Sequence, residues 1–305
     1  MEIVQKEIMT KVSIIIPTYR RSKLLAEALN SVLEQTFCDY EVIVVDDFSN
    51  DEGETESVVR SFSENRFKYI CLDCRRGPAG ARNAALPYCN GKYLSFLDSD
   101  DLIRPKKLEN HVLILDNSPD VAMVYSDEFI LYENGMMSLD PSRKDRVPPL
   151  PSGFVARAFF LDSFIGTMTV TLRKDVFEQV GGFDEKMKLN EDDDLWLRIM
   201  IKHKVLFSDY PAGVRRIHKG GASQEGNISR NRDEMVYYQY KCFMKYFETN
   251  KDFSWKNTDI FRSRADRVMS NYLKICLMNF KIPKIKNIML HLQLIKRIRD
   301  IERSK

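Results

Sequence analysis

The chain has 305 residues, and 44% of them are hydrophobic, which is enough for a packed core and excludes disorder throughout. Its 47 basic and 44 acidic side chains leave a formal charge of +3, so no global basic field indicates nucleic acid as a partner. Residues 1–10 carry charged side chains and no apolar run, so we expect neither a secretory signal nor an amphipathic transit peptide there.

Membrane spans and cysteines bear on where the protein resides. No window holds the ~18 uncharged apolar residues that a membrane-spanning helix needs. We interpret the six cysteines as reduced thiols, because they are scattered rather than framing a small domain: Cys38, Cys71, Cys74, Cys89, Cys242 and Cys276. The sequence therefore predicts a cytoplasmic protein.

Predicted strands and helices alternate through the first part of the chain. A β-branched run at 12–16 is ended by Pro17, and residues 22–35 place apolar side chains on one helical face. The alternation continues with strands expected at 41–45, 67–72, 92–97 and 121–125 and helices at 52–63, 78–88 and 105–117. Such alternation predicts a largely parallel sheet covered on both faces by helices.

The pattern becomes less regular after residue 126. Asn134 and Gly135 indicate a hairpin turn, and the proline-rich segment 147–151 indicates an extended connector. Further on, we expect strands at 167–172, 205–207 and 214–217 and a helix at 195–201.

Long helices rich in Tyr, Phe, Met, Lys and Arg are expected from residue 228 onward. The final stretch, 283–305, carries seven basic side chains against two acids. A basic amphipathic helix can rest on an anionic membrane, which would place the protein peripherally at the inner face of the membrane. Packing on the domain or dimerisation would give the same pattern.

Two groups of acids follow predicted strands. Asp46 and Asp47 end the second strand, where a carboxylate can accept hydrogen bonds from a nucleobase or ribose, although acids there also cap helices. Asp98, Asp100 and Asp101 follow the strand at 92–97, so one carboxylate could bind an oxygen-preferring cation while another holds a ribose hydroxyl. Asp101 could instead cap the helix that starts near residue 105.

Other candidates are weaker when each is taken alone. Arg82 lies in a glycine-containing segment at a helix start and could meet phosphate. The four acids 191–194 open a helix, where the macrodipole favours negative charge, and crowded like charges raise the pKa of a general base. His218 lies in a glycine-bearing loop that could close over a diphosphate.

Six motifs in this order resemble those of family 2 glycosyltransferases with a GT-A fold. The resemblance covers roughly residues 11 to 225. The motifs are Val12-Ser13-Ile14-Ile15-Ile16-Pro17-Thr18-Tyr19-Arg20, Val44-Val45-Asp46-Asp47-Phe48-Ser49, Ala81-Arg82-Asn83, Phe96-Leu97-Asp98-Ser99-Asp100-Asp101, Val180-Gly181-Gly182-Phe183-Asp184-Glu185 and Glu191-Asp192-x-Asp194-Leu195-Trp196-Leu197-Arg198.

The resemblance implies an α/β architecture and a type of reaction. The implied GT-A nucleotide-diphospho-sugar transferase fold has a Rossmann-like mixed, mainly parallel sheet with helices on both faces. We expect this domain at 1–225 and a basic, helical C-terminal extension at 226–305. The implied activity is inverting transfer of a sugar from a nucleoside diphosphate donor, with UDP as the default, to a glycan or lipid-linked acceptor in surface polysaccharide or lipopolysaccharide synthesis. A divalent metal, Mg²⁺ or Mn²⁺, would bind the diphosphate.

The resemblance also assigns roles to individual residues. The nucleotide-binding residues would be Pro17, Tyr19, Asp47, Arg82 and Asp98. The metal would be held by Asp100 and His218. The catalytic base would be Asp192. The acceptor side would be formed by Gly182, Phe183, Asp184 and Trp196, with an aromatic ring stacked on a sugar face.

Asp193 departs from the family pattern, because many relatives carry an aromatic or apolar residue there. We expect Asp192 to be the base, with Asp193 as the second candidate, and the added charge to raise the pKa of the base. Two other classes stay open. A sugar-phosphate nucleotidyltransferase should show a glycine-rich loop after the first strand, where this chain has Pro17-Thr18-Tyr19. A non-catalytic nucleotide-sugar or glycan-binding module would be expected to lose the metal acids or the base.

Overall fold

The computed structural model describes residues 10–139, 150–217, 232–278 and 282–303. The chain forms two units. The first unit comprises Met1–Gly153, Ile165–Glu185 and His203–Lys219, and the second comprises Phe154–Phe164, Lys186–Lys202 and Gly220–Lys305. Each unit thus combines stretches that are distant in the sequence. The domain boundary expected at residues 225 and 226 lies outside the described residues.

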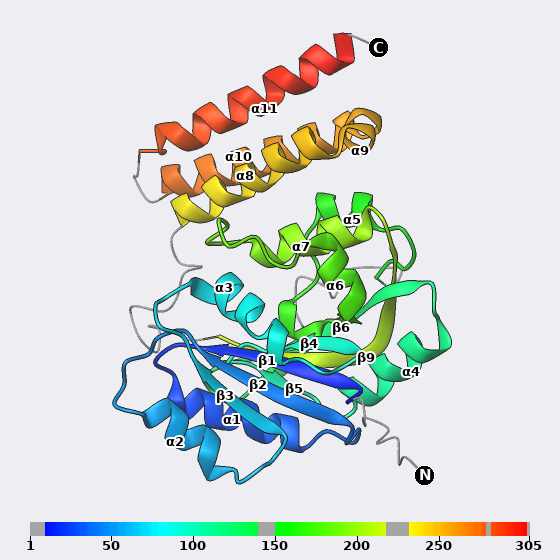
Figure 1. Ribbon diagram of the computed structural model, residues 1–305. Helices are drawn as coiled ribbons and strands as arrows, with labels where there is room; N and C mark the ends of the chain where they lie inside the picture. The colour runs from blue at the N-terminus through cyan, green and yellow to red at the C-terminus, as the bar shows by residue number, and fades with distance from the viewer. Residues whose placement is uncertain (1–9, 140–149, 218–231, 279–281, 304–305) are drawn as a thin grey trace. The chain divides into compact units, whose positions relative to one another are not determined.

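A nine-stranded sheet organises the first unit, in the order β3-β2-β1-β4-β8-β6-β9-β5, with β7 paired to β6 (Figure 1). The strands are β1 (Val12–Thr18), β2 (Tyr40–Asp46), β3 (Phe67–Cys71), β4 (Tyr93–Phe96), β5 (Leu102–Ile103), β6 (Val121–Leu131), β7 (Met137–Leu139), β8 (Thr171–Arg173) and β9 (Lys204–Arg216).

The parallel part of this sheet agrees with the alternation in the sequence. Strands β3, β2, β1 and β4 are parallel to one another, and every residue of β1 and β2 is buried. Such complete burial requires cover on both faces, which explains the continuous Val and Ile runs. Figure 1 shows α1 and α2 on one face of the sheet and α3 on the other.

The helices of the first unit start close to the predicted positions. They are α1 (Ser22–Leu33), α2 (Glu54–Ser61), α3 (Gly77–Ala84), α4 (Lys107–Asn117) and the unpredicted α6 (Lys174–Val180). The helix expected at 78–88 is shorter, because a 3₁₀ turn at Leu86–Tyr88 contains Pro87 and replaces its last part. Proline lacks the N–H that a continuing α-helix would need.

Four of the expected strands need correction. Pro17 does not end the first strand, which runs to Thr18. The N–H of Leu97 donates to the carbonyl of Ile15, so Pro17, two residues further, faces the same side beyond the end of β4 and its missing donor breaks no ladder. The strand expected at 167–172 is a 3₁₀ turn, Thr167–Thr169, followed by the short antiparallel β8.

The strands expected at 205–207 and 214–217 form one continuous strand, β9. Pro211 and Gly213 break the strand pattern in the sequence but not the strand itself. Where its pairing with β6 shifts register, the hydroxyl of Ser126 accepts a hydrogen bond from the N–H of Ala212. The predicted hairpin is confirmed, because Gly135 at φ 78° lies in the turn between β6 and β7. The connector expected at 147–151 falls largely outside the described residues.

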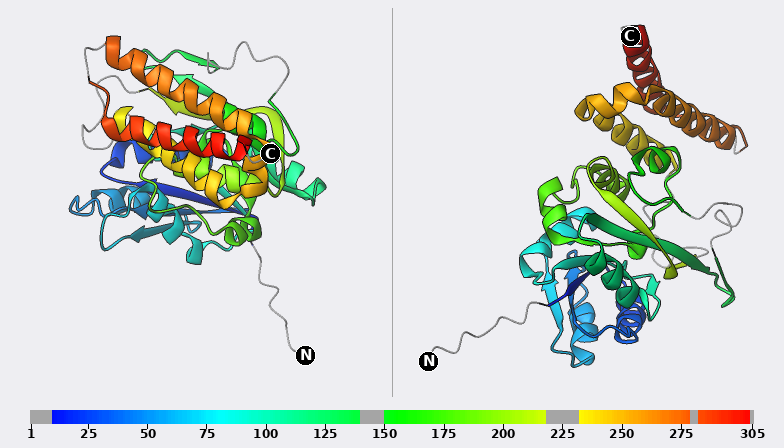
Figure 2. Two further views of the ribbon diagram at one scale, coloured as in Figure 1. Left: turned by 90° about the horizontal axis from the view of Figure 1, so that it is seen from above. Right: turned by 90° about the vertical axis from the view of Figure 1, so that its right-hand side faces the viewer.

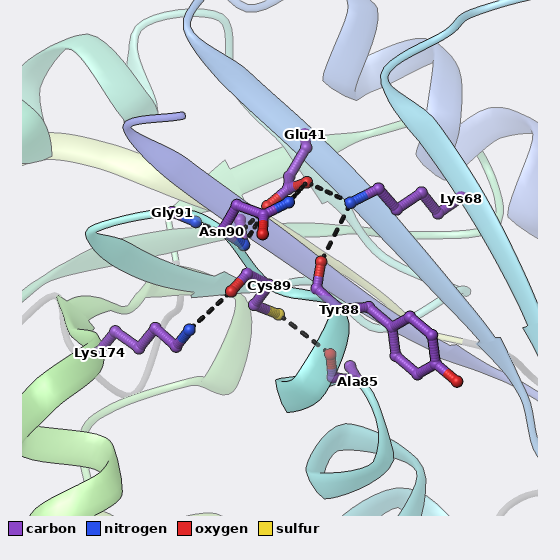
Figure 3. A network of polar contacts seen from close by, with 9 residues as sticks. Glu41, Lys68, Ala85, Tyr88, Cys89, Asn90, Gly91 and Lys174 are labelled. Atoms are coloured by element: carbon purple, nitrogen blue, oxygen red, sulfur yellow. Dashed lines mark hydrogen bonds and ion pairs between the residues drawn. The ribbon is translucent and has the colours of Figure 1, made fainter. Parts of the chain in front are cut away.

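A polar network joins the amino-terminal ends of β1, β2 and β3 to the turn before β4 (Figure 3). The buried carboxylate of Glu41 accepts hydrogen bonds from Ser13 at 2.7 Å, from Lys68 at 2.7 Å and from the N–H of Asn90 at 2.5 Å. A Cβ added to Gly91 would lie 2.4 Å from the backbone nitrogen of Ser13, so the turn needs glycine there. We call these five residues the amino edge.

Helices build the second unit, as the sequence predicts for residues after 228. They are α5 (Ala156–Leu161), α7 (Glu191–Met200), α8 (Arg232–Thr249), α9 (Lys251–Lys256), α10 (Thr258–Met278) and α11 (Ile285–Arg303). Helices α8, α10 and α11 pack side by side (Figure 2). Phe160 of α5 joins them, with ring centroids 5.0 Å from Phe243 and 4.3 Å from Phe261. Within the described ranges, no helix has the length and apolarity needed to cross a membrane.

Candidate functional site

Asp46 and Asp47 lie at the carboxyl-terminal end of β2, and both are buried. Asp46 accepts hydrogen bonds from the Tyr69 hydroxyl and from the backbone of the following loop. Asp47 accepts from the N–H groups of Arg76 at 2.6 Å and Gly77 at 2.9 Å, where α3 begins. Burial raises the pKa of Asp47, although these two N–H groups act in the opposite direction. Asp47 therefore fixes the loop that leads into α3.

Pro17 and Tyr19 lie at the neighbouring end of β1. Pro17 is buried in the strand, whereas Tyr19 is partly exposed. The guanidinium carbon of Arg75 lies 3.9 Å from the centroid of the Tyr19 ring, and that of Arg20 lies 5.4 Å away. Two arginines beside an aromatic ring form a surface that can receive an anionic, planar ligand.

Arg82 and Asp98 form an ion pair at the carboxyl-terminal end of β4, with 2.6 Å between Arg82 Nη2 and Asp98 Oδ1. The Arg82 side chain is 3% exposed and the Asp98 side chain 33%. The Arg82 guanidinium lies 5.1 Å from the centroid of the buried Phe183 ring. Arg82 thus holds Asp98 in place, and Asp98 retains access to solvent.

Asp100 faces Arg21, which follows β1, at 2.5 Å, and its side chain is 20% exposed. Asp101 is buried and accepts a hydrogen bond from the N–H of Arg216 in β9, so it does not cap α4 as one alternative proposed. Burial and the charges of Asp100 and Asp98 raise the pKa of Asp101 well above its ordinary value. Asp101 therefore connects the turn after β4 to β9, whereas the side chains of Asp98 and Asp100 remain partly exposed.

We call Asp47, Arg82, Asp98 and Asp100 the carboxyl edge. Among the residues that the structure describes, no three His, Cys, Asp or Glu side chains are grouped so as to hold a metal ion. The pair Asp98 and Asp100 nevertheless fits Mg²⁺ or Mn²⁺, because such ions bind one or two carboxylates and complete their shell with water and substrate phosphate. His218, the other predicted ligand, lies outside the described residues.

The segment expected on the acceptor side is attached to α3. The side-chain amide of Asn83 accepts from the N–H of Phe183 at 3.0 Å and donates to its carbonyl oxygen at 2.9 Å. Phe183 is 3% exposed and packs edge-on against Phe96 at 5.4 Å, so its ring is part of the core and is not presented to a sugar. Gly182 is buried at φ 67°, and Asp184 is partly exposed.

Helix α7 of the second unit carries the last acidic cluster in its first turn, as predicted. Asp194 is fully buried and pairs with Arg198 at 2.8 Å and with Lys245 of α8 at 2.8 Å. It is therefore a structural residue that joins α7 to α8. Trp196 is also fully buried, so the expectation that its ring stacks on a sugar face does not fit the structure.

Asp192 and Asp193 have different surroundings. The carboxylate of Asp193 accepts a hydrogen bond from the Ser163 hydroxyl at 2.9 Å and lines a small cavity between α5, α7, α8 and α10. Burial and the charge of Asp192 raise the pKa of Asp193 to about 7. Asp192 accepts from the N–H of Asp193 at 2.8 Å and does not line that cavity. Asp193 is thus directed into the helical unit.

Sequence reasoning missed three residues that shape these sites: Arg21, Arg75 and Asn83. The first two follow strands β1 and β3, and a basic side chain after a strand in an alternating pattern is a signal that could have located them. Asn83 belongs to a recognised motif, but its role depends on a segment one hundred residues away in the chain.

Comparisons with known proteins bear on this arrangement. The family model described as glycosyl transferase family 2 matches residues 13–181. An uncharacterized glycosyltransferase of Rickettsia conorii is 31% identical over 225 residues, which is 74% of this chain and 37% of that protein. The Escherichia coli UDP-Glc:alpha-D-GlcNAc-diphosphoundecaprenol beta-1,3-glucosyltransferase WfgD is 32% identical over 190 residues, covering 62% of this chain and 69% of that protein.

The chain spans less than half of the length of some relatives, with 37% of the R. conorii protein and 44% of one from Rickettsia felis. Among solved structures, S. aureus TarS in complex with UDP-GlcNAc superposes with a TM-score of 0.69 at 20% identity, covering 95% of this chain and 81% of that one. A mannosyltransferase from Pyrobaculum calidifontis in complex with GDP-Man and Mn²⁺ gives 0.58 at 19% identity, covering 93% and 85%. These likenesses confirm the predicted fold class.

Proposed function

The chain belongs to glycosyltransferase family 2, and on that premise we propose that it transfers a sugar, with inversion, from a nucleoside diphosphate donor to a hydroxyl of a glycan or lipid-linked acceptor. The observation that carries the proposal is the carboxyl edge of the first unit. There Asp98 and Asp100 follow β4, remain partly exposed, and are each held by an arginine, Arg82 or Arg21. An arginine-braced carboxylate pair at the ends of parallel strands suits a diphosphate with its counter-ion.

The donor is proposed to be a UDP-sugar. The name of WfgD specifies UDP-Glc, and the TarS structure contains UDP-GlcNAc, whereas the Pyrobaculum enzyme was solved with GDP-Man. The proposed nucleotide-binding residues are Pro17, Tyr19, Asp47, Arg82 and Asp98. Because Tyr19 lies against Arg75, its ring could stack on the base while the guanidinium faces the phosphates.

The proposed metal-binding residues are Asp100 and His218. A bound divalent cation would neutralise the charge that develops on the departing diphosphate. In the described structure Asp100 faces Arg21, so this arginine would be displaced from Asp100 or would share it when the donor complex assembles. Arg21 would then be available to pair with a phosphate oxygen.

Asp192 is the proposed general base. Its carboxylate would take the proton from the acceptor hydroxyl as that oxygen attacks the anomeric carbon. The bond from the anomeric carbon to the diphosphate oxygen would break at the same time, with the electron pair leaving on the nucleoside diphosphate. Attack opposite the leaving group inverts the anomeric configuration.

The acceptor is proposed to be a lipid-linked intermediate or a growing surface polysaccharide, on the cytoplasmic side of the membrane. WfgD is named for a diphosphoundecaprenol acceptor, and another relative, WcaA, for colanic acid biosynthesis. We propose residues 1–225 as the transferase domain. Gly182 and Asp184 remain candidates for its acceptor side. Residues 226–305 form the proposed helical extension, to which α5 and α7 attach through Arg264 and Lys245.

The proposal is tested by thermal unfolding of the purified protein with UDP, GDP, dTDP or CDP, each with Mn²⁺ or with a chelator. A ligand that binds only the folded protein at about 100 times its dissociation constant stabilises it by about 2.7 kcal/mol. We expect UDP to raise Tm with Mn²⁺, and Asp100→Asn to abolish the increase.

Glu56→Gln is the matched control, because Glu56 forms an exposed pair with Arg60 within α2 and is not one of the proposed donor-binding residues. If no diphosphate raises Tm under any condition, the proposed donor site is wrong. If a diphosphate binds but no transfer occurs with any nucleotide sugar, the protein is a nucleotide-sugar binding module.

A further inference from the structure

The second unit exposes an unusual concentration of large apolar side chains. Among the described residues of this unit, the exposed ones other than Phe154 all lie between residues 273 and 292, from the end of α10 into α11: Leu273, Leu277, Ile282, Ile285, Met289 and Leu292. Exposed apolar residues scattered singly need no explanation, but a contiguous group marks an interaction surface.

Within α11 the exposed residues form one stripe. Ile285 is 73% exposed, Met289 54% and Leu292 60%, and their spacing of four and three residues places them on one face of the helix. The opposite face carries Asn287 and Leu294, which are fully buried against the other helices. Helix α11 thus has one apolar face that packs in the unit and a second that faces solvent.

The same stripe becomes basic in the second half of the helix. Lys296, Arg299 and Arg303 continue the spacing, and all three are exposed. Within the described residues no ion pair involves Lys296 or Arg299, and Asp300 flanks the stripe without lying on it. One face of α11 therefore offers apolar side chains followed by positive charges.

We propose that this stripe, residues 285, 289, 292, 296, 299 and 303 of α11, docks on an anionic membrane surface, with Leu277 and Ile282 at its apolar end. A helix that lies in the interface inserts its apolar side chains into the acyl boundary and pairs its cations with acidic headgroups. A second copy of the chain is a poorer partner, because it would bring further cations to a stripe that has no acid of its own. This proposal does not depend on the sugar-transfer activity.

The test is flotation of the full chain with vesicles of equal parts phosphatidylglycerol and phosphatidylcholine, compared with vesicles of phosphatidylcholine alone. We expect the protein to float with the anionic vesicles and to be released by high salt. The triple variant Ile285→Ser, Met289→Ser, Leu292→Ser should lower the vesicle-bound fraction by about tenfold or more. Lys296→Glu with Arg299→Glu should lower binding to anionic vesicles and remove its dependence on salt.

A matched control replaces exposed apolar residues of the first unit, Leu113→Ser with Met136→Ser, which are 61% and 64% exposed. This control should float like the wild type. All variants should keep the wild-type Tm, because the substituted side chains are exposed, and the triple variant should retain any stabilisation by UDP and Mn²⁺, which separates this proposal from the proposed function.

The proposal is overturned if the wild type does not float with anionic vesicles, or if the triple variant floats as well as the wild type. It is also overturned if light scattering without lipid shows a dimer that the triple variant dissolves, since the stripe would then be an interface between copies.

Discussion

The two ends of the parallel strands in the first unit both carry acidic and basic side chains, but they differ in solvent access. At the amino edge, Glu41 is 5% exposed and is surrounded by donors from Ser13, Lys68 and Asn90. At the carboxyl edge Asp47 is also 5% exposed, but the side chains of Asp98 and Asp100 are 33% and 20% exposed. A buried carboxylate that accepts several hydrogen bonds from the protein stabilises the fold. A partly exposed carboxylate that pairs with an arginine can exchange that partner for a ligand.

This difference suggests a criterion for the other acids of the chain. On α7, Asp194 resembles Glu41, because it is buried between Arg198 and Lys245. Asp193 is directed toward Ser163 inside the helical unit. Asp192 is partly exposed, and we test it as the catalytic carboxylate of α7 with the substitutions that follow.

The largest effect is expected for Asp192→Asn. Loss of a general base lowers the transfer rate by 10²- to 10⁴-fold, and we expect about 10³-fold. The measurement is the initial rate of sugar transfer with the donor found by thermal unfolding.

Asp193→Asn is the matched control for Asp192→Asn and should change the transfer rate little. The folded pKa of Asp193 is raised from its ordinary value of 3.8 to about 7, so the folded protein holds this proton more tightly than the unfolded chain does. Stability therefore falls as pH rises from about 4 to about 7, and the loss is complete above that range. The variant should therefore be more stable than the wild type above about pH 7. Near-normal transfer by Asp192→Asn together with loss of transfer by Asp193→Asn would reverse the two assignments.

The next effect separates activity from stability at the carboxyl edge. Asp100→Asn should lower transfer by about 10²- to 10³-fold, because it removes charge stabilisation at the diphosphate. The same change should cost at most about 1 kcal/mol of unfolding free energy, as expected for a partly exposed ion pair with Arg21. The transfer rate and the unfolding free energy in urea should be measured on the same preparation of Asp100→Asn. A large loss of stability would show that Asp100 is a structural residue.

Gly91→Ala should show the opposite behaviour at the amino edge. The added Cβ would lie 2.4 Å from the backbone nitrogen of Ser13, so the turn must shift, at a cost of about 3 kcal/mol. At Gly53 an added Cβ meets open space, and Gly53→Ala should cost only the backbone strain of a positive φ, about 1 kcal/mol. Equal destabilisation in urea unfolding would show that the close approach at Gly91 is unimportant.

The smallest effect concerns the charge of Glu41. Burial raises the pKa of Glu41, but hydrogen bonds from Lys68, Asn90 and Ser13 outweigh it and hold the pKa below its ordinary value of 4.5. The unfolded chain therefore binds the proton more readily, so the stabilisation is present above about pH 4.5 and is lost as pH falls through the folded pKa.

Glu41→Gln should consequently cost about 1.5 kcal/mol near neutral pH and progressively less in acid. Urea unfolding across this pH range measures the difference, with Glu56→Gln as an exposed control that should cost less than about 0.5 kcal/mol. A loss that does not depend on pH would show that the charge of Glu41 contributes nothing.

Much of the first unit could be predicted from the sequence because its signals are local. The apolar run in β1 and the helical spacing in α1 each lie within one element, and the acids that end β2 and β4 follow directly from the strand positions. The errors occurred where distant residues intervene, as in the long strand β9, which β6 and the Ser126 hydroxyl hold together across Pro211.

The sequence by itself determined the alternation of strands and helices, the acids at strand ends and the helical C-terminal part, since hydrophobic periodicity and charge position are properties of neighbouring residues. Only the tertiary structure decided which of these side chains are accessible. Phe183 lies in the core, where Asn83 binds its backbone, and Asp194 is buried in an ion pair with Lys245. Trp196 is also buried, whereas Met289 on α11 is exposed to solvent. Burial and pairing depend on residues far apart in the chain, and the pattern within one element does not contain that information.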